Sequence, residues 1–120
     1  MVSRPEQLRD RTKLFALRII RLFRSLPYRT DTQVLGKQLL RCGTSVAANY
    51  RAVCRARSKS EFIARIGVVA EEADECVLWL ELLTESGIVK PDMTADLLKE
   101  AKELTAIITA SQQTAKRSLV

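Results

Sequence analysis

A series of positively charged side chains at helical spacing is the feature of this chain that could bind a ligand. The positions step by alternating four and three residues, and two small uncharged residues lie between the cations: Lys37, Arg41, Thr44, Ala48, Arg51 and Arg55. This spacing puts them on one outward face of a helix, and Arg57 and Lys59 extend that face around the following turn. Lysine and arginine neutralise phosphates without reading bases, so the series predicts a surface for RNA or DNA. A solvated helix face is the alternative, because no groove-reading motif accompanies the series.

The same cations lack an acidic partner on their own helix. Asp31 is the one acid between residues 31 and 56, and it lies at the far end of that segment. The cations are therefore expected to face water, a neighbouring subunit or a polyanion.

Charge is divided unevenly along the sequence. Residues 1–60 carry fourteen Lys and Arg against three acids, whereas residues 61–120 carry six against eleven. The two halves, +11 and −5, sum to the net charge of +6. This division favours either a surface for a polyanion or two complementary surfaces through which copies of the chain associate.

Carboxylates are densest at Glu71, Glu72, Asp74 and Glu75. A carboxylate metal site in a helical bundle draws ligands from several helices and usually includes histidine, but this chain has no histidine. The commonest general base and the Ser–His and Cys–His pairs are absent for the same reason, and no glycine-rich phosphate loop is present. We therefore expect no enzymatic activity, no metal or other cofactor, and no small-molecule substrate.

Length and composition predict one domain over residues 1–120. No apolar run approaches the roughly 20 residues that cross a bilayer, and the start does not resemble a signal peptide, so a cytoplasmic protein without a membrane partner is expected. Cys42, Cys54 and Cys76 are an odd, widely spaced set. They are predicted to be small buried hydrophobic residues and not a disulfide framework.

Apolar residues recur every three or four positions, which predicts four helices. Their expected bounds are about 6–26, 31–56, 59–86 and 93–116. Pro27 and Gly87 should end the first and third helices, and Thr30, Ser58 and Asp92 are the predicted N-caps of the other three. Matched lengths and short connections predict an all-α fold, an antiparallel up-down-up-down four-helix bundle.

The core faces can be read from the same spacing. The third helix presents Phe62, Ile66, Val69, Ala73, Cys76, Leu80 and Leu83. The second presents Leu35, Leu39, Cys42, Val46, Asn49, Val53 and Ala56. Asn49 is the single polar member of that stripe, so we predict a buried asparagine paired with a buried Glu72 or with a backbone carbonyl.

Two helices carry more apolar surface than a single bundle can bury. Leu14 and Leu17 project away from the core face of the first helix, among Arg18 and Arg21. Leu78, Trp79 and Leu82 do the same on the third, beside Glu71 and Glu75. Because the two patches differ and are opposite in charge, they predict head-to-tail contacts that close into a homo-oligomeric ring. A monomer with an apolar surface is the alternative.

Several short runs of sequence together resemble a known family. They are Gly43-Thr44-Ser45-Val46-Ala47-Ala48-Asn49-Tyr50-Arg51, then Ser58-Lys59-Ser60-Glu61-Phe62, Glu72-Ala73-Asp74-Glu75 and Trp79-Leu80. These residues resemble the four-helix-bundle proteins encoded in intervening sequences of bacterial 23S rRNA genes. The resemblance implies an antiparallel bundle, a homopentameric ring and no established enzymatic activity. The accessory variability protein of diversity-generating retroelements looks like a distant relative that binds nucleic acid and a reverse transcriptase.

Two positions depart from the family pattern. Ala52-Val53 stand where the family usually has an acid, and Glu71 stands where it often has lysine. These changes make one face more basic and the other more acidic. The sequence thus predicts a non-enzymatic oligomer that binds RNA or DNA weakly and without sequence preference, and the resemblance implies that the oligomer is a pentamer. The alternative function is a scaffold that docks a protein such as a reverse transcriptase.

Overall fold

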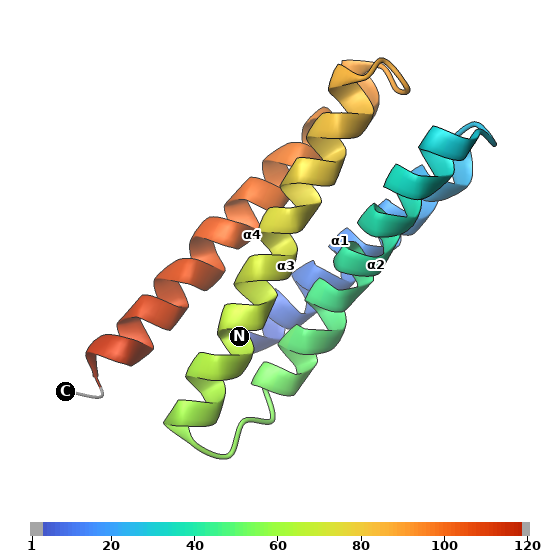
Figure 1. Ribbon diagram of the computed structural model, residues 1–120. Coiled ribbons are helices and arrows are strands. Elements are labelled where there is room, and N and C mark those ends of the chain that lie inside the picture. The colour runs from blue at the N-terminus through green and yellow to red at the C-terminus, as the bar shows by residue number, and fades with distance from the viewer. Residues whose placement is uncertain (1–3, 119–120) are drawn as a thin grey trace.

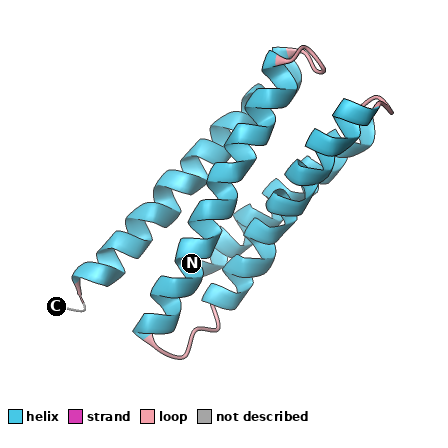
Figure 2. Cartoon of the chain, viewed as in Figure 1, coloured by secondary structure: helices cyan, strands magenta, loops and turns pink. Residues whose placement is uncertain are grey.

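The computed structural model describes residues 4–118, and within them the chain forms four α-helices and no strand. The helices are α1 (Arg4–Ser25), α2 (Thr30–Val53), α3 (Lys59–Glu85) and α4 (Pro91–Arg117). They lie side by side as an elongated bundle with short connections at its ends (Figures 1 and 2). Helix α2 packs between α1 and α3, α4 packs on α3, and α1 touches α4 more sparsely. The all-α prediction with four helices is confirmed.

The helix bounds differ from the predicted ones by at most three residues. The predicted cap of α3 is present, because the Ser58 hydroxyl accepts a hydrogen bond of 3.0 Å from the Glu61 amide. Gly87 follows α3 with a φ of +83°, a conformation that glycine adopts without strain. These local signals lie within a few residues of each helix end, which explains why the sequence revealed them.

Two predicted N-caps were wrong. Helix α2 begins at Thr30 with Arg29 as its cap residue, and the carboxylate of Asp31 accepts from the Thr32 amide at 2.8 Å. Helix α4 begins at Pro91, with Lys90 as its cap, so Asp92 lies inside the first turn. Proline suits the first helical position because its φ is fixed and its missing amide would have had no partner there.

Helix α2 also ends earlier than predicted, at Val53 instead of Ala56. The amides of Arg55 and Ala56 bond to carbonyls three residues back, which tightens the chain into a turn. Ser58 must be extended to cap α3, so the residues before it cannot remain helical. Cys54 therefore falls in the turn, where it is exposed, and the prediction that all three cysteines are buried was wrong for this residue.

The core follows the predicted faces with one rotation in α2. Ile66, Val69, Ala73, Cys76, Leu80 and Leu83 of α3 are buried as expected. In α2, however, Tyr50 is buried and Asn49 is only half-buried. The amide of Asn49 donates to the Ser45 carbonyl of its own helix at 2.9 Å. The predicted pairing of Asn49 with a backbone carbonyl is confirmed, whereas its full burial and the alternative partner Glu72 were wrong. Burial raises the pKa of Tyr50 to about 12.

An ion-pair clamp joins the two helices that touch least. The Arg11 guanidinium on α1 donates to both carboxylate oxygens of Glu100 on α4 at 2.7 Å, and to Glu103 at 2.7 Å. The Glu100 side chain is 16% exposed, so its pairing is partly shielded from water. The hydrogen bond from Arg11 lowers the pKa of Glu100. The clamp therefore stabilises the closure of the bundle wherever Glu100 is ionised.

We expect Arg11→Gln to lower the free energy of unfolding by about 1 kcal/mol at pH 7, as for a favourable, partly exposed ion pair. Because the folded pKa of Glu100 lies below its unfolded value of about 4.3, this contribution is present above that pH and is lost as the pH falls through the folded pKa. Urea unfolding at pH 7 and at pH 3 measures it. The control is Arg9→Gln, because among the described residues the ion pairing of Arg9 is limited to a 3.8 Å contact with Asp10. Equal effects of both variants at pH 7 would contradict the clamp.

Candidate nucleic-acid interface

The structure divides the six predicted phosphate-binding cations among three places. Lys37 lies near the α1–α2 turn, where it lines a hollow with Tyr28 and Arg29. Arg41 lies midway along α2. Arg51, Arg55, Arg57 and Lys59, which we call the basic end, lie where α2 turns into α3. All six are exposed, but Lys37 and Arg51 are about 21 Å apart along α2 at 1.5 Å per residue, and the paired Arg41 lies between them. The predicted single surface is therefore interrupted.

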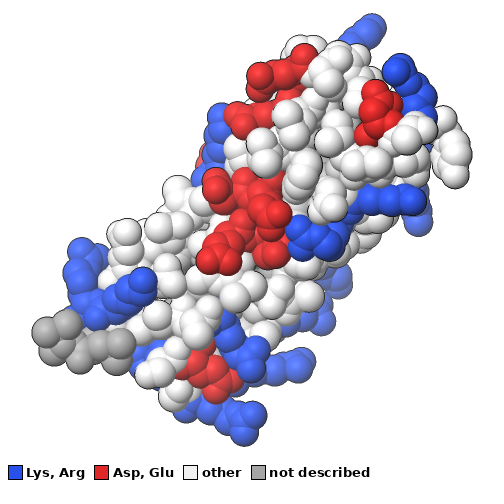
Figure 3. Space-filling model, viewed as in Figure 1, with Lys and Arg blue, Asp and Glu red and all other residues white. Residues whose placement is uncertain are grey.

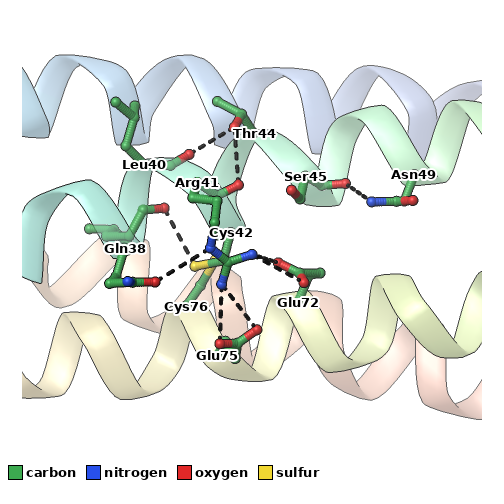
Figure 4. A network of polar contacts seen from close by, with 11 residues as sticks. Gln38, Leu40, Arg41, Cys42, Thr44, Ser45, Asn49, Glu72, Glu75 and Cys76 are labelled. Carbon is green, nitrogen blue, oxygen red and sulfur yellow. Dashed lines mark hydrogen bonds and ion pairs between the residues drawn. The ribbon is translucent and has the colours of Figure 1, made fainter.

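The charge of Arg41 is neutralised by acidic side chains of the same chain. Its guanidinium lies 3.2 Å from Glu72 and 3.2 Å from Glu75, both on α3, as Figure 4 shows. The two carboxylates, Glu72 first, raise the pKa of Arg41. Water, another subunit and a polyanion were the partners expected for this arginine, and the correct one is the neighbouring helix of the same chain. Packing of α2 against α3 brings together residues more than thirty positions apart, which helical spacing cannot reveal.

The same ion pairs change the predicted roles of the two acids. The Glu72 side chain is 17% exposed and pairs with Arg41, so it is partly buried but is not the partner of Asn49. Glu75 was expected to face a second subunit, yet it already binds Arg41. Figure 3 shows the largest cluster of acidic side chains near the middle of this face with basic side chains beside it, and further acidic and basic side chains toward both ends of the bundle.

Sequence reasoning missed two cations of α1 that join the basic end. Arg9 and Lys13 line one hollow with Arg51, Arg55, Asp10 and Cys54, and we call it the α1–α2 hollow. Its volume is about 500 Å³. Arg51, Arg55 and Lys13 form no ion pair with any residue between positions 4 and 118. The four-residue spacing of Arg9 and Lys13 was a signal, but only the packing of α1 on α2 places it beside Arg51.

The predicted contact residues of the oligomer are mostly exposed. Leu14 is 52% exposed, Leu17 40%, Leu78 47% and Leu82 39%. Glu71 is exposed as well. Their exposure fits an interface and equally fits a monomer with an apolar surface.

Trp79, Arg18 and Arg21 are placed differently from the leucines. Trp79 packs partly against the core, and its indole Nε1 is buried without a hydrogen-bond partner among the described residues, so its placement wholly outside the core was wrong. Arg18 and Arg21 line a second hollow together with Asp92 and Asp96 of α4. That hollow therefore contains two cations and two acids.

Two cysteines meet in the core. The Sγ atoms of Cys42 and Cys76 are 3.0 Å apart, and both residues are fully buried and carry free thiols. The hydrogen bond with Cys42 and burial raise the pKa of the Cys76 thiol. Within residues 4–118, no cluster of three or more His, Cys, Asp or Glu is arranged to hold a metal ion. None of the described helices is long and apolar enough to cross a bilayer.

Comparison with known proteins gives the family. Residues 7–110 match the family described as 23S rRNA-intervening sequence protein. The chain belongs to this family. A crystal structure from Bacteroides thetaiotaomicron VPI-5482, described as a protein with unknown function from the S23 ribosomal protein family, superposes with a TM-score of 0.85. It is 28% identical in sequence, and the match covers 92% of this chain and 99% of the other. None of the curated proteins matches this chain, and neither family description names a catalytic activity.

The three cysteines should differ sharply in reactivity. Cys54 is exposed, whereas Cys42 and Cys76 are buried and the Cys76 thiol is held protonated. Treatment of the folded protein with iodoacetamide should therefore add one group, at Cys54, and treatment in denaturant should add three. Mass spectrometry of the intact protein and its peptides measures this. Two or more adducts formed rapidly on the folded protein would contradict the buried pair.

Proposed function

We propose that this member of the intervening-sequence family is a non-enzymatic protein that binds RNA or DNA weakly and without sequence preference through the basic end. The observation that carries the proposal is a contrast between different arginines of the chain. Arg11, Arg41 and Arg65 are neutralised by carboxylates of their own chain, whereas Arg51 and Arg55 have no such partner among the described residues. Cations that lack acidic neighbours remain available to phosphates.

The side chains of the basic end account for two properties of the proposed binding, its lack of sequence preference and its sensitivity to salt. Arginine and lysine bind phosphates, which are the same in every sequence, so discrimination between unrelated sequences should be small. Each phosphate contact adds about 0.9 to the slope of log affinity against log salt, so a small number of contacts gives weak binding that salt weakens further. A cytoplasmic location is part of the proposal, since an exposed free thiol at Cys54 suits a reducing compartment.

The test of binding is fluorescence anisotropy with labelled structured RNA and duplex DNA across a series of salt concentrations. Arg51→Glu combined with Arg55→Glu should weaken binding at least tenfold at low salt and reduce the salt slope by about two contacts. The matched control is Lys99→Glu with Lys102→Glu on α4, which changes the net charge equally at exposed lysines. Absence of wild-type binding at low salt would reject the proposal and favour a scaffold that docks a protein partner.

We also propose that the antiparallel, up-down-up-down bundles associate head to tail into a closed ring, with five copies as the number that the family resemblance implies. The support is the pair of apolar patches, Leu14 and Leu17 on α1 and Leu78 and Leu82 on α3. A closed heterologous contact buries both patches in every copy. Arg18, Arg21 and Glu71 remain candidates for the charged rim of this contact, whereas Glu75 is already paired.

Light scattering after gel filtration tests the assembly. The wild-type protein should have a multiple of its monomer mass of 13.5 kDa, and Leu17→Lys with Leu78→Lys should reduce it to a monomer by placing charges in a buried contact. Val34→Lys is the control, because Val34 is 58% exposed on α2, outside both patches. A monomeric wild type at micromolar concentration would reject the ring. An oligomer that survives the double variant would reject this pairing of faces.

A further inference from the structure

We propose that the α1–α2 hollow is a phosphate cradle for duplex nucleic acid, with Arg9 and Lys13 of α1 binding the backbone opposite Arg51 of α2 and Arg55 of the turn that follows it. The inference rests on the proposed function. It adds a second helix to the binding surface and identifies the hollow that the backbone phosphates contact. It also specifies a double-stranded ligand.

The hollow holds two rows of cations, one on α1 and one at the end of α2. Arg9 and Lys13 are four residues apart and span about 6 Å along α1. Arg51 lies in the last turn of α2, and Arg55 lies in the turn that follows it. Packed helices have axes about 8–10 Å apart, which brings the two rows to opposite sides of one cavity. Four long, flexible side chains can therefore converge on a single stretch of backbone.

The positive charges that line the hollow outnumber the negative ones among the described lining residues. Four cations face one acid, Asp10, whose side chain is 72% exposed and lies 3.8 Å from Arg9. An exposed pair at that distance contributes little. The hollow between α1 and α4 is different, because Arg18 and Arg21 share it with Asp92 and Asp96. The α1–α2 hollow thus retains a mutual repulsion that an anionic ligand would relieve.

The lining of the hollow favours duplex over single-stranded nucleic acid. Among residues 4–118, those that line it are cations, one acid and a cysteine, and none of them is aromatic. Proteins that bind single strands combine cations with aromatic platforms on which the bases stack. A duplex keeps its bases stacked inside and presents phosphates outward, so cations alone can bind it.

The first experiment reverses the α1 row alone. Arg9→Glu with Lys13→Glu should weaken binding of a 20-base-pair RNA or DNA duplex at least tenfold at low salt. Arg51→Glu with Arg55→Glu, which we call the α2 reversal, should do the same. The Lys99→Glu and Lys102→Glu control should weaken it less than threefold. If the α1 reversal behaves like this control while the α2 reversal abolishes binding, the cradle is wrong and the proposed function stands. If the wild type binds neither duplex, both are wrong.

A single strand of the same length and sequence, chosen to have no secondary structure, tests the preference for a duplex. It should bind at least fivefold more weakly than the duplex at the same salt concentration. Equal or tighter binding of the single strand would overturn the inference.

Cys54 provides a second test that requires no variant. It is the exposed cysteine and it lines the hollow, whereas Cys42 and Cys76 are buried internal standards. Saturating duplex should slow iodoacetamide alkylation of Cys54 in the wild-type protein at least fivefold. An unchanged rate under conditions in which anisotropy reports a saturated complex would show that the ligand binds elsewhere and would overturn the cradle.

Discussion

Helix α2 must pack closely against α1 and α3 at the same time, and the arrangement of the remaining surface depends on that constraint. On one side, a Cβ atom at Gly43 would lie only 3.0 Å from the Ile19 side chain, so the missing side chain lets α1 approach. On the other side, Cys42 meets Cys76 of α3 at 3.0 Å. Two such close contacts, on adjacent residues, fix the rotation of α2 about its axis.

That rotation decides which polar groups the bundle uses and which it leaves to solvent. It turns Tyr50 into the core and leaves Asn49 at the edge, where its own helix satisfies the amide. It aims Arg41 at Glu72 and Glu75, so the middle of the basic series becomes part of the contact between α2 and α3. No described acid of α3 pairs with Arg51 in the last turn of α2 or with Arg55 in the turn that follows, and both remain beside the cations of α1.

The division of charge along the sequence therefore acquires a second meaning in space. Acids of the second half neutralise selected cations of the first half: Glu100 and Glu103 hold Arg11, while Glu72 and Glu75 hold Arg41. These pairs join α1 to α4 and α2 to α3. The cations left over are not spread evenly, because four of them line one hollow with a single acid. A positive field concentrated in one concave place attracts a polyanion more effectively than the same charges scattered over a surface.

The sequence by itself determined the number of helices, their approximate bounds, most of their buried faces and the family. Those properties depend on residues within one or two turns of each other: Ser58 with Glu61, Gly87 after α3, and apolar residues every three or four positions. Only the tertiary structure decided the partner of Arg41, the exchange of Asn49 for Tyr50 in the core, the exposure of Cys54 and the meeting of Arg9 and Lys13 with Arg51 and Arg55. The physical reason lies in the precision of helical periodicity, which defines the buried face of a helix only to within about one residue, or roughly 100° of rotation. Pairing between helices depends on which residue within those roughly 100° points at the neighbouring helix.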